Sequence, residues 1–203
     1  MQPEQKFDLQ ALMTNPVVKN AISNINPGLM ERRAFRPPRC EVFKSGTTSL
    51  RNTDRYRFEI DAEAKRQLPR IIDNQVQIVI GEDQPDQEQV ERLSRPRTIG
   101  VVFSGGPAPG GHNVIAGIFD AAKQANPDSR LVGFLMGPDG IIENEYVELT
   151  AEIVDVYRNM GGFTMIRTGR TKIDTQEKMA LSRQTCRDLG LDALVVVGGD
   201  DSN

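Results

Sequence analysis

The chain has 203 residues, a formal net charge of −3 at pH 7, 5% aromatic residues and no tryptophan. This length can bury an ordinary core in one large or two small domains without a disulfide scaffold. The two cysteines, Cys40 and Cys186, form no CxxC pair, which excludes a zinc ribbon, and we expect both thiols to be buried. No apolar run approaches 18 residues and the N-terminus lacks a signal-peptide pattern, so we expect a cytoplasmic protein without membrane contact. The small charge and few aromatic residues argue against a nucleic-acid partner.

The charge and texture of the chain change near residues 95–98, which predicts a domain boundary between positions 97 and 98. Residues 1–97 carry 16 Lys and Arg against 14 Asp and Glu, whereas residues 98–203 carry 9 against 14. The first half is polar, poorly periodic and interrupted by prolines. We interpret it as a helical and irregular N-terminal extension with no evident chemistry of its own.

Four local features are predicted in this extension. We expect short helices over 8–13 and 61–74, a strand over 75–80 and a charged connector over 81–97. The extension also holds a cluster of arginines: Arg32, Arg33, Arg36 and Arg39. A grip on phosphate is possible for such a cluster, but we favour solvated or interface-paired side chains.

Residues 98–203 alternate short apolar strands with amphipathic helices. We predict strands over 98–103, 131–136, 163–166 and 193–197, and helices over 113–125, 146–160 and 174–190. Strands that are almost wholly apolar need cover on both faces, as in a parallel sheet. The sequence therefore predicts an α/β fold with a doubly wound, mostly parallel sheet of the Rossmann type.

Ligands bind beyond the carboxyl ends of the strands in such a sheet, and three loops of this chain lie there. The first, residues 104–111 (SGGPAPGG), has glycines that let the backbone approach an anion, and it precedes a helix N-terminus with unpaired N–H groups. It is neither a Walker A loop, because His112-Asn113 stands where Lys and Ser/Thr belong, nor a GxGxxG dinucleotide loop. We expect His112, the sole histidine, to have a structural role.

The second and third loops also carry groups suited to phosphate chemistry. Residues 167–172 (RTGRTK) place three cations where they can pair with phosphate oxygens. In residues 198–203 (GGDDSN), adjacent carboxylates repel each other unless one meets a cation, so Asp200 is a candidate partner of Mg²⁺, through water. Taken singly, the first loop is as consistent with a structural turn as with an anion site, and the second is as consistent with a solvated surface as with a phosphate contact.

Three segments together resemble the phosphofructokinases, in the pyrophosphate-dependent branch. They are Gly100–Gly111 (GVVFSGGPAPGG), the GRTKI segment that contains Arg170, and Leu194–Asn203 (LVVVGGDDSN). The resemblance covers residues 98–203, and residues 1–97 are similar to the N-terminal extension of the long pyrophosphate-dependent forms. It implies reversible, Mg²⁺-dependent transfer of a phosphoryl group from pyrophosphate to O1 of fructose 6-phosphate, the glycolytic step that yields fructose 1,6-bisphosphate.

The resemblance also implies roles for individual residues. It assigns binding of the donor to Gly105, Gly106, Gly199 and Ser202. Arg170 and Asp201 would be catalytic, with Arg170 in contact with the phosphoryl donor, and Asp200 would serve Mg²⁺. Asp201 stands where ATP-dependent relatives have glycine, and it would act in donor choice by excluding ATP.

The family's catalytic Thr-Ile-Asp segment and its sugar-phosphate site have no match in this sequence. The chain ends at Asn203 inside the loop that should open the next helix, so we expect a sheet that is incomplete at that edge. We therefore expect either a fragment of a longer enzyme or a chain that works with a separate polypeptide, and we expect it to be inactive alone. The complete enzyme is expected to be a homo-oligomer. Two other interpretations stay open: a non-catalytic regulatory subunit or phosphate-binding module, and an NAD or lipid kinase relative that shares the GGD loop.

Overall fold

The computed structural model describes residues 11, 14–19, 27–44, 47–55, 61–70, 76–82, 84 and 86–202. The chain divides into two compact units. The larger unit contains residues 1–36 together with residues 95–203, and the smaller unit contains residues 37–94. We predicted one boundary between positions 97 and 98. The structure divides the chain three residues earlier and also groups the residues before 37 with the second half.

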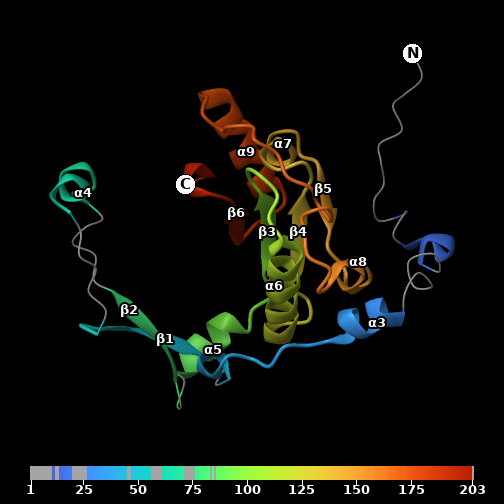
Figure 1. Ribbon diagram of the computed structural model, residues 1–203, viewed down its shortest axis with the longest axis horizontal. Coiled ribbons are helices and arrows are strands. Elements are labelled where there is room, and N and C mark those ends of the chain that lie inside the picture. The colour runs from blue at the N-terminus through green and yellow to red at the C-terminus, as the bar shows by residue number, and fades with distance from the viewer. Residues whose placement is uncertain are drawn as a thin grey trace. The chain divides into compact units, whose positions relative to one another are not determined.

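The larger unit is built on a four-stranded sheet with the order β5-β4-β3-β6 (Figure 1). The central strand β3 (Thr98–Phe103) pairs in parallel with β4 (Arg130–Phe134) on one side and with β6 (Ala193–Val197) on the other. The short strand β5 (Tyr146–Glu148) pairs with β4 in the antiparallel direction. The mostly parallel sheet is confirmed, and β3 and β6 occupy the residues predicted for them.

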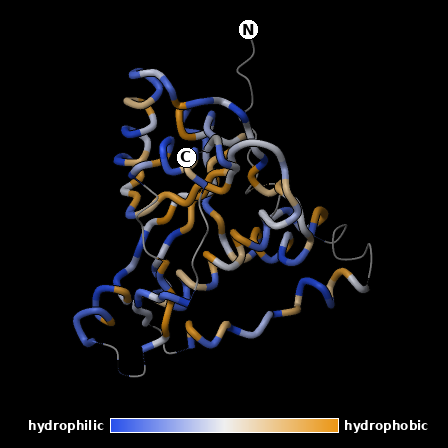
Figure 2. The backbone as a smooth tube through the Cα atoms, turned by 60° about the vertical axis from the view of Figure 1, so that its left-hand side comes forward, coloured by the Kyte–Doolittle hydropathy of each residue, from blue (hydrophilic) through white to orange (hydrophobic). Residues whose placement is uncertain are grey.

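Helices cover both faces of this sheet. They are α6 (Gly111–Ala125), α7 (Pro138–Ile142), α8 (Ala151–Tyr157) and α9 (Gln176–Asp188). Because successive side chains of a strand point to opposite faces, Val101 and Phe103 pack with Ile115 of α6 and Ile153 of α8, whereas Val102 packs with residues of α7 and α9. Figure 2 shows hydrophobic residues along the strands at the centre of this unit. The doubly wound α/β fold is therefore confirmed.

One predicted helix is two elements in the structure. Helices α6 and α9 begin and end within two residues of the ranges 113–125 and 174–190. The range 146–160 was wrong as a single helix, because Tyr146–Glu148 pairs with β4 and α8 begins only after Thr150. These three residues form a strand rather than a helical turn because the free edge of β4 offers backbone groups with which β5 can form hydrogen bonds.

The predicted strand over 163–166 is a turn. Phe163, Met165 and Ile166 are buried, as the apolar pattern required, but the backbone N–H of Arg167 bonds back to the carbonyl oxygen of Phe163 at 2.8 Å. The backbone N–H of Met165 donates to the ring of His112 at 3.0 Å. The left-handed conformations of Gly161, Gly162 and Arg167 bend the chain on either side, so no ladder can form.

The described residues of the smaller unit form a two-stranded antiparallel sheet and three short helices. The strands are β1 (Thr48–Asn52) and β2 (Gln77–Gly81), and the helices are η1 (Glu41–Phe43), α4 (Ala62–Gln67) and α5 (Gln87–Leu93). The strand predicted over 75–80 is confirmed within two residues. The helix predicted over 61–74 is confirmed only for α4, because residues 68–70 are not helical and residues 71–74 lie outside the described residues. The prediction that residues 81–97 form an irregular connector was wrong over residues 87–93, which form α5. Asp86 caps this helix, because its side chain accepts a hydrogen bond from the backbone N–H of Glu88. The helix over 8–13 lies, except for residue 11, outside the described residues.

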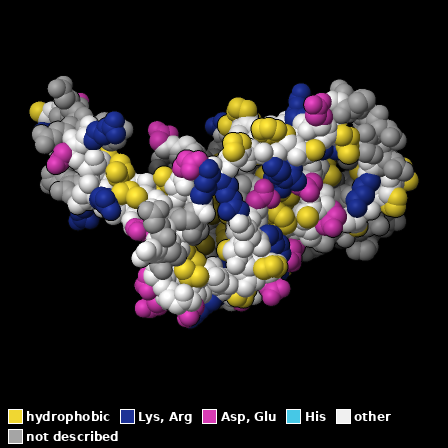
Figure 3. Space-filling view, turned by 90° about the horizontal axis from the view of Figure 1, so that it is seen from below, with side chains coloured by type: hydrophobic (Ala, Val, Ile, Leu, Met, Phe, Trp, Pro, Cys, Tyr) yellow, Lys and Arg dark blue, Asp and Glu magenta, His cyan; other side chains and the backbone are white. Residues whose placement is uncertain are grey.

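The two cysteines differ in how far they are exposed. Cys186 is partly buried, which raises the pKa of its thiol, but Cys40 is exposed, so the expectation that both are buried was wrong. On the face drawn in Figure 3, Lys and Arg side chains are interspersed with Asp and Glu and with small hydrophobic groups. No helix in the described part of the chain has the length and apolar character needed to cross a bilayer.

Candidate functional site

Three loops meet at the carboxyl end of β3. We name them the glycine loop (residues 104–111), the arginine loop (167–172) and the GGD loop (198–202). The backbone N–H of Gly105 donates to the carbonyl oxygen of Gly169 at 2.8 Å, and Ser104 forms a parallel bridge with the same residue. The hydroxyl of Ser202 donates to Ser104 Oγ at 3.1 Å. The structure thus brings together the three loops that the sequence placed at one end of the sheet.

The arginine loop is fixed by backbone packing on both sides. The hydroxyl of Thr168 lies 3.1 Å from the carbonyl oxygen of Phe103 and 2.9 Å from that of Gly105, and donates to this pair. On the other side, a Cβ on Gly169 would lie 2.2 Å from the carbonyl oxygen of Met136, and one on Gly137 would lie 2.3 Å from the backbone nitrogen of Gly169. Such close approach requires glycine at both positions, and it holds the loop between the ends of β3 and β4.

Arg170 lies beside the glycine loop. Its Nη2 atom is 3.3 Å from the point where a Cβ on Gly106 would stand. Arg170 is exposed, and no carboxylate of a described residue forms a salt bridge with it, unlike Arg97, Arg130 and Arg158. A guanidinium with free donors next to a glycine backbone can receive an anion through charge-assisted hydrogen bonds.

The two glycines of this contact differ in what they offer. Gly105 has a φ of 98°, a conformation that side chains rarely adopt, and its N–H already bonds to Gly169. The N–H of Gly106 makes no hydrogen bond with any described residue, so it can donate to a ligand. Within the predicted donor-binding pair, Gly105 therefore sets the bend of the glycine loop, and Gly106 has the backbone N–H that could bind a ligand.

Two non-glycine residues near the arginine loop adopt the left-handed conformation. Met136 has a φ of 60° and Arg167 a φ of 59°. The backbone N–H of Met136 donates to the carbonyl oxygen of Ile166 at 2.9 Å, so the two turns hold each other in place. Such conformations persist only where the surrounding structure fixes them, and they concentrate at functional sites.

Asp139 is a residue of this region that the sequence pattern did not single out. It lies in the first turn of α7, and its Oδ2 atom accepts a hydrogen bond from the hydroxyl of Thr171 at 2.9 Å. The contact ties the arginine loop to the turn after β4. The sequence Gly137-Pro138-Asp139 after an apolar strand is typical of a helix start, so it could have indicated this turn.

The GGD loop places Asp200 at the end of β6. Asp200 is exposed and begins a short 3₁₀ turn, η2 (Asp200–Ser202), while the side chain of Asp201 lies outside what the structure describes. No group of three or more His, Cys, Asp or Glu side chains among the described residues forms a metal cage. Mg²⁺ at phosphate sites usually takes one or two carboxylates, substrate oxygens and water, and Asp200 suits that mode of binding.

His112 connects α6 to the segment before the arginine loop. It is 2% exposed, its Nε2 atom accepts from the backbone N–H of Met165, and its ring lies 4.8 Å from that of Tyr157. Burial lowers the pKa of the imidazole below 6.5, although the backbone of Gly161 acts in the opposite direction. The ring is therefore neutral and structural at pH 7.

The burial of His112 predicts a loss of stability in acid. The folded protein holds a neutral ring, whereas the unfolded chain takes up a proton as the pH falls below about 6.5. The stabilisation is thus present above that pH and is lost as the pH falls further. We expect the Tm of the wild type to drop more steeply between pH 7.5 and pH 5 than that of His112→Gln, whose amide can still accept from Met165. Parallel pH profiles would contradict this role.

Comparisons with known proteins match the half of the chain that carries the site. A family model described as phosphofructokinase matches residues 98–203. A pyrophosphate--fructose 6-phosphate 1-phosphotransferase of Porphyromonas gingivalis is 62% identical over 114 residues, which cover 56% of this chain and 21% of the relative. Subunit beta 2 of the enzyme of that name from Arabidopsis thaliana is 51% identical over 119 residues, covering 59% of this chain and 21% of the subunit.

A solved structure is also similar. The T-state crystal structure of Pichia pastoris phosphofructokinase matches 63% of this chain and 14% of that chain, with 25% identity and a TM-score of 0.43. The chain spans about a fifth of the length of the curated relatives that it matches. Because the family model covers more than half of the sequence and includes all three loops, the chain belongs to the phosphofructokinase family.

Proposed function

We propose that this chain forms the pyrophosphate-binding part of an enzyme that transfers a phosphoryl group from pyrophosphate to O1 of fructose 6-phosphate. The observation that carries the proposal is the Arg170 guanidinium beside Gly106, at the carboxyl end of a parallel sheet, where no carboxylate of a described residue pairs with it. Family membership and the names of the relatives support the choice of substrates.

The residues of the three loops suit phosphoryl transfer. The transferred group passes through a loose transition state whose charge lies on the equatorial oxygens, so catalysis depends on positioning and electrostatic stabilisation. Arg170 can pair with two of these oxygens, and the N–H of Gly106 can donate to a third. Gly199 and Ser202 would border the donor from the GGD loop. Mg²⁺, held by Asp200 and phosphate oxygens, would neutralise charge on the pyrophosphate.

The acceptor half of the reaction would come from outside residues 1–203. The curated relatives are about five times as long as the matched segment, and one of them is named as a beta subunit. We place fructose 6-phosphate and the base that activates its hydroxyl on the remainder of a longer chain or on another subunit of an oligomer. Two free cysteines, one of them exposed, agree with a cytoplasmic location.

The function is tested by the donor preference of the full-length enzyme that contains this chain. With fructose 6-phosphate and Mg²⁺, pyrophosphate should give fructose 1,6-bisphosphate, while ATP at equal concentration should give little, and a chelator should abolish the reaction. Residues 1–203 alone should give no product because they lack the acceptor site. Binding of pyrophosphate without turnover would instead favour a phosphate-binding or regulatory module.

Asp201 gives a prediction about donor choice. We expect the Asp201 carboxylate, adjacent in sequence to Asp200, to add volume and negative charge at the donor site, which a third phosphate would meet and pyrophosphate would not. In Asp201→Gly, the ratio of kcat/KM for ATP to that for pyrophosphate should rise by at least about tenfold. Asp201→Asn, which removes the charge and keeps the volume, should give a smaller rise. A ratio that changes by less than tenfold in Asp201→Gly would refute the role of Asp201 in excluding ATP.

A further inference from the structure

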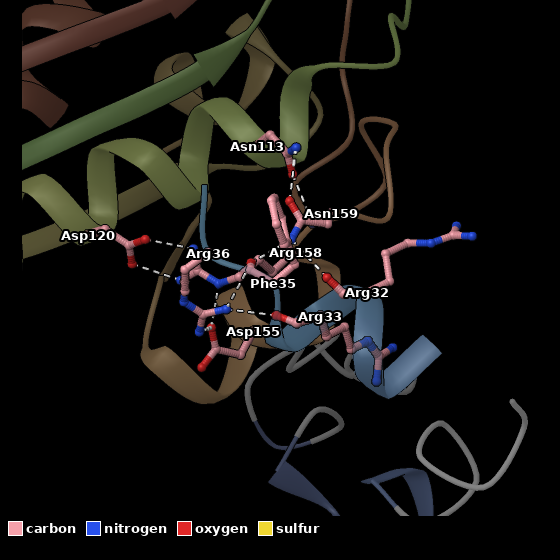
Figure 4. A network of polar contacts seen from close by, with 9 residues as sticks. All are labelled: Arg32, Arg33, Phe35, Arg36, Asn113, Asp120, Asp155, Arg158 and Asn159. Carbon is pink, nitrogen blue, oxygen red and sulfur yellow. Dashed lines mark hydrogen bonds and ion pairs between the residues drawn. The ribbon is translucent and has the colours of Figure 1, made fainter. Parts of the chain in front are cut away.

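The side chain of Asn159, two residues after α8, bonds to a segment of the N-terminal part of the chain. Helix α3 (Pro27–Ala34) and the two residues after it form a segment, residues 27–36, which we name the clamp. The Asn159 Nδ2 atom donates to the carbonyl oxygens of Arg32 and Phe35, both at 2.9 Å (Figure 4). These two carbonyls lie at the end of the clamp, where a helix leaves such groups unpaired, so Asn159 satisfies them.

Charged side chains reinforce the same junction. Arg36 of the clamp pairs with Asp155 at 3.1 Å, and Arg158 donates to the same carboxylate at 2.8 Å. Arg158, whose side chain is 6% exposed, also forms two hydrogen bonds with Asp120 of α6, at 2.7 and 2.8 Å (Figure 4). A bidentate pair with a buried guanidinium fixes geometry well. The clamp, α8 and α6 are thus joined by alternating charges, and Arg36 is interface-paired as the sequence suggested.

Asn159 also reaches the start of α6, directly after the glycine loop. Its backbone N–H donates to Asn113 Oδ1 at 2.9 Å, and Asn113 Nδ2 donates to Asn159 Oδ1 at 3.3 Å. Two further bonds join the following residues to the loop: the N–H of Gly162 donates to the carbonyl oxygen of Pro109 at 2.9 Å, and that of His112 to Gly162 at 3.0 Å. One amide therefore connects the clamp on one side with the anchor of the glycine loop on the other.

The chemistry of this position requires an amide. Asn159 has a φ of 58°, which asparagine tolerates better than most side chains. Its Nδ2 donates to the clamp while its Oδ1 accepts from Asn113, so a carboxylate could keep the second contact but not the first. An aspartate here would also set a negative charge against two carbonyl oxygens. Asn159→Asp is therefore a selective way to release the clamp.

We propose that Asn159 is a positioning residue through which the clamp sets the conformation of the glycine loop and thereby the binding of pyrophosphate. The kinetic part of this inference rests on the proposed function, whereas the coupling between the clamp and the loop does not. Releasing the clamp frees the end of α8, and with it the backbone bonds that hold Pro109 and His112. The loop then loses order at the place where Gly106 faces Arg170.

The test compares Asn159→Asp with Asn144→Asp in the full-length enzyme. Asn144 has the same left-handed backbone, with a φ of 57°, and is exposed away from the clamp. In Asn159→Asp, the KM for pyrophosphate should rise about tenfold, the effect expected from one or two lost hydrogen bonds. The KM for fructose 6-phosphate should change less than about twofold. Asn144→Asp should change neither constant.

Hydrogen exchange gives a readout that does not depend on activity. The amides of residues 105–113 should exchange faster in Asn159→Asp than in the wild type, with no change in β3. Arg36→Ala, which weakens the clamp from its own side, should act in the same direction, and should add little in the presence of Asn159→Asp. This second variant decides the matter if Asn159→Asp fails to fold.

The outcomes separate the two proposals. Unchanged exchange in residues 105–113 for both variants, or equal changes in both KM values, would overturn the role of Asn159. A wild-type enzyme that makes no product from pyrophosphate would overturn the proposed function, and the exchange experiment would still decide whether the clamp orders the loop.

Discussion

Replacing Arg170 with alanine in the full-length enzyme is expected to cost about 2–4 kcal/mol of transition-state stabilisation, the range for the loss of one preorganised donor. The guanidinium lies beside Gly106, and no described carboxylate competes for it. The charge of the loose transition state lies on the equatorial oxygens that Arg170 is proposed to contact, so the loss should fall mainly on kcat. The measurement is kcat and KM for pyrophosphate and for fructose 6-phosphate.

Two variants control this experiment. Arg170→Lys keeps the charge but loses the planar fork, so it should recover only part of the rate. Arg187→Ala removes an exposed arginine from α9, away from the loops, and should leave kcat within about twofold, as expected of a surface substitution. An unchanged kcat/KM for pyrophosphate in Arg170→Ala would show that the arginine loop is a solvated turn.

The second large effect is expected on stability, from Gly169→Ala. A methyl group at this position would stand 2.2 Å from the carbonyl oxygen of Met136, a backbone atom that cannot turn aside. The arginine loop must then move away from the turn after β4. The loop also bonds to Gly105, so its shift disturbs the glycine loop as well. We expect a loss of about 3 kcal/mol or more, at the upper end for overpacking, together with a loss of activity.

Gly117→Ala is the matched control for this substitution. A Cβ on Gly117 meets no atom within 4 Å, and the residue lies inside α6. Alanine is favoured over glycine in a helix interior by about 0.5–1 kcal/mol, so this variant should be slightly more stable than the wild type. Thermal unfolding of the full-length enzyme and both variants measures the contrast. A Tm of Gly169→Ala equal to that of the wild type would mean that the loop is not packed as described.

The elements of the larger unit could be predicted where the sequence carries a strong pattern. Strands β3 and β6 are uninterrupted apolar runs, and α6 shows helical spacing, so each is specified locally. The turn over residues 163–166 and the short strand β5 could not be separated from their alternatives. Burial alone does not distinguish a buried turn from a buried strand, and three residues at a sheet edge continue the pattern of the helix that follows.

The location of the candidate site could be predicted from the sequence, but the contacts that hold its loops in place could not. The rule that ligands lie at the carboxyl ends of parallel strands brought the three loops together, including Arg170 and Gly106. The contacts of Asp139 with Thr171 and of Asn159 with Arg32 depend on the fold of segments far apart in sequence. A single sequence gives no sign of such pairs, because asparagine and aspartate are common in ordinary turns.

The most direct test of the donor site is the position of a bound, non-hydrolysable pyrophosphate analogue in a crystal structure of the full-length enzyme with Mg²⁺. The account predicts that its phosphate oxygens lie within hydrogen-bonding distance of the Arg170 guanidinium and the Gly106 N–H, with the metal beside Asp200. A diphosphate that occupies another part of the enzyme at saturating concentration, and leaves these groups without contact, would contradict it.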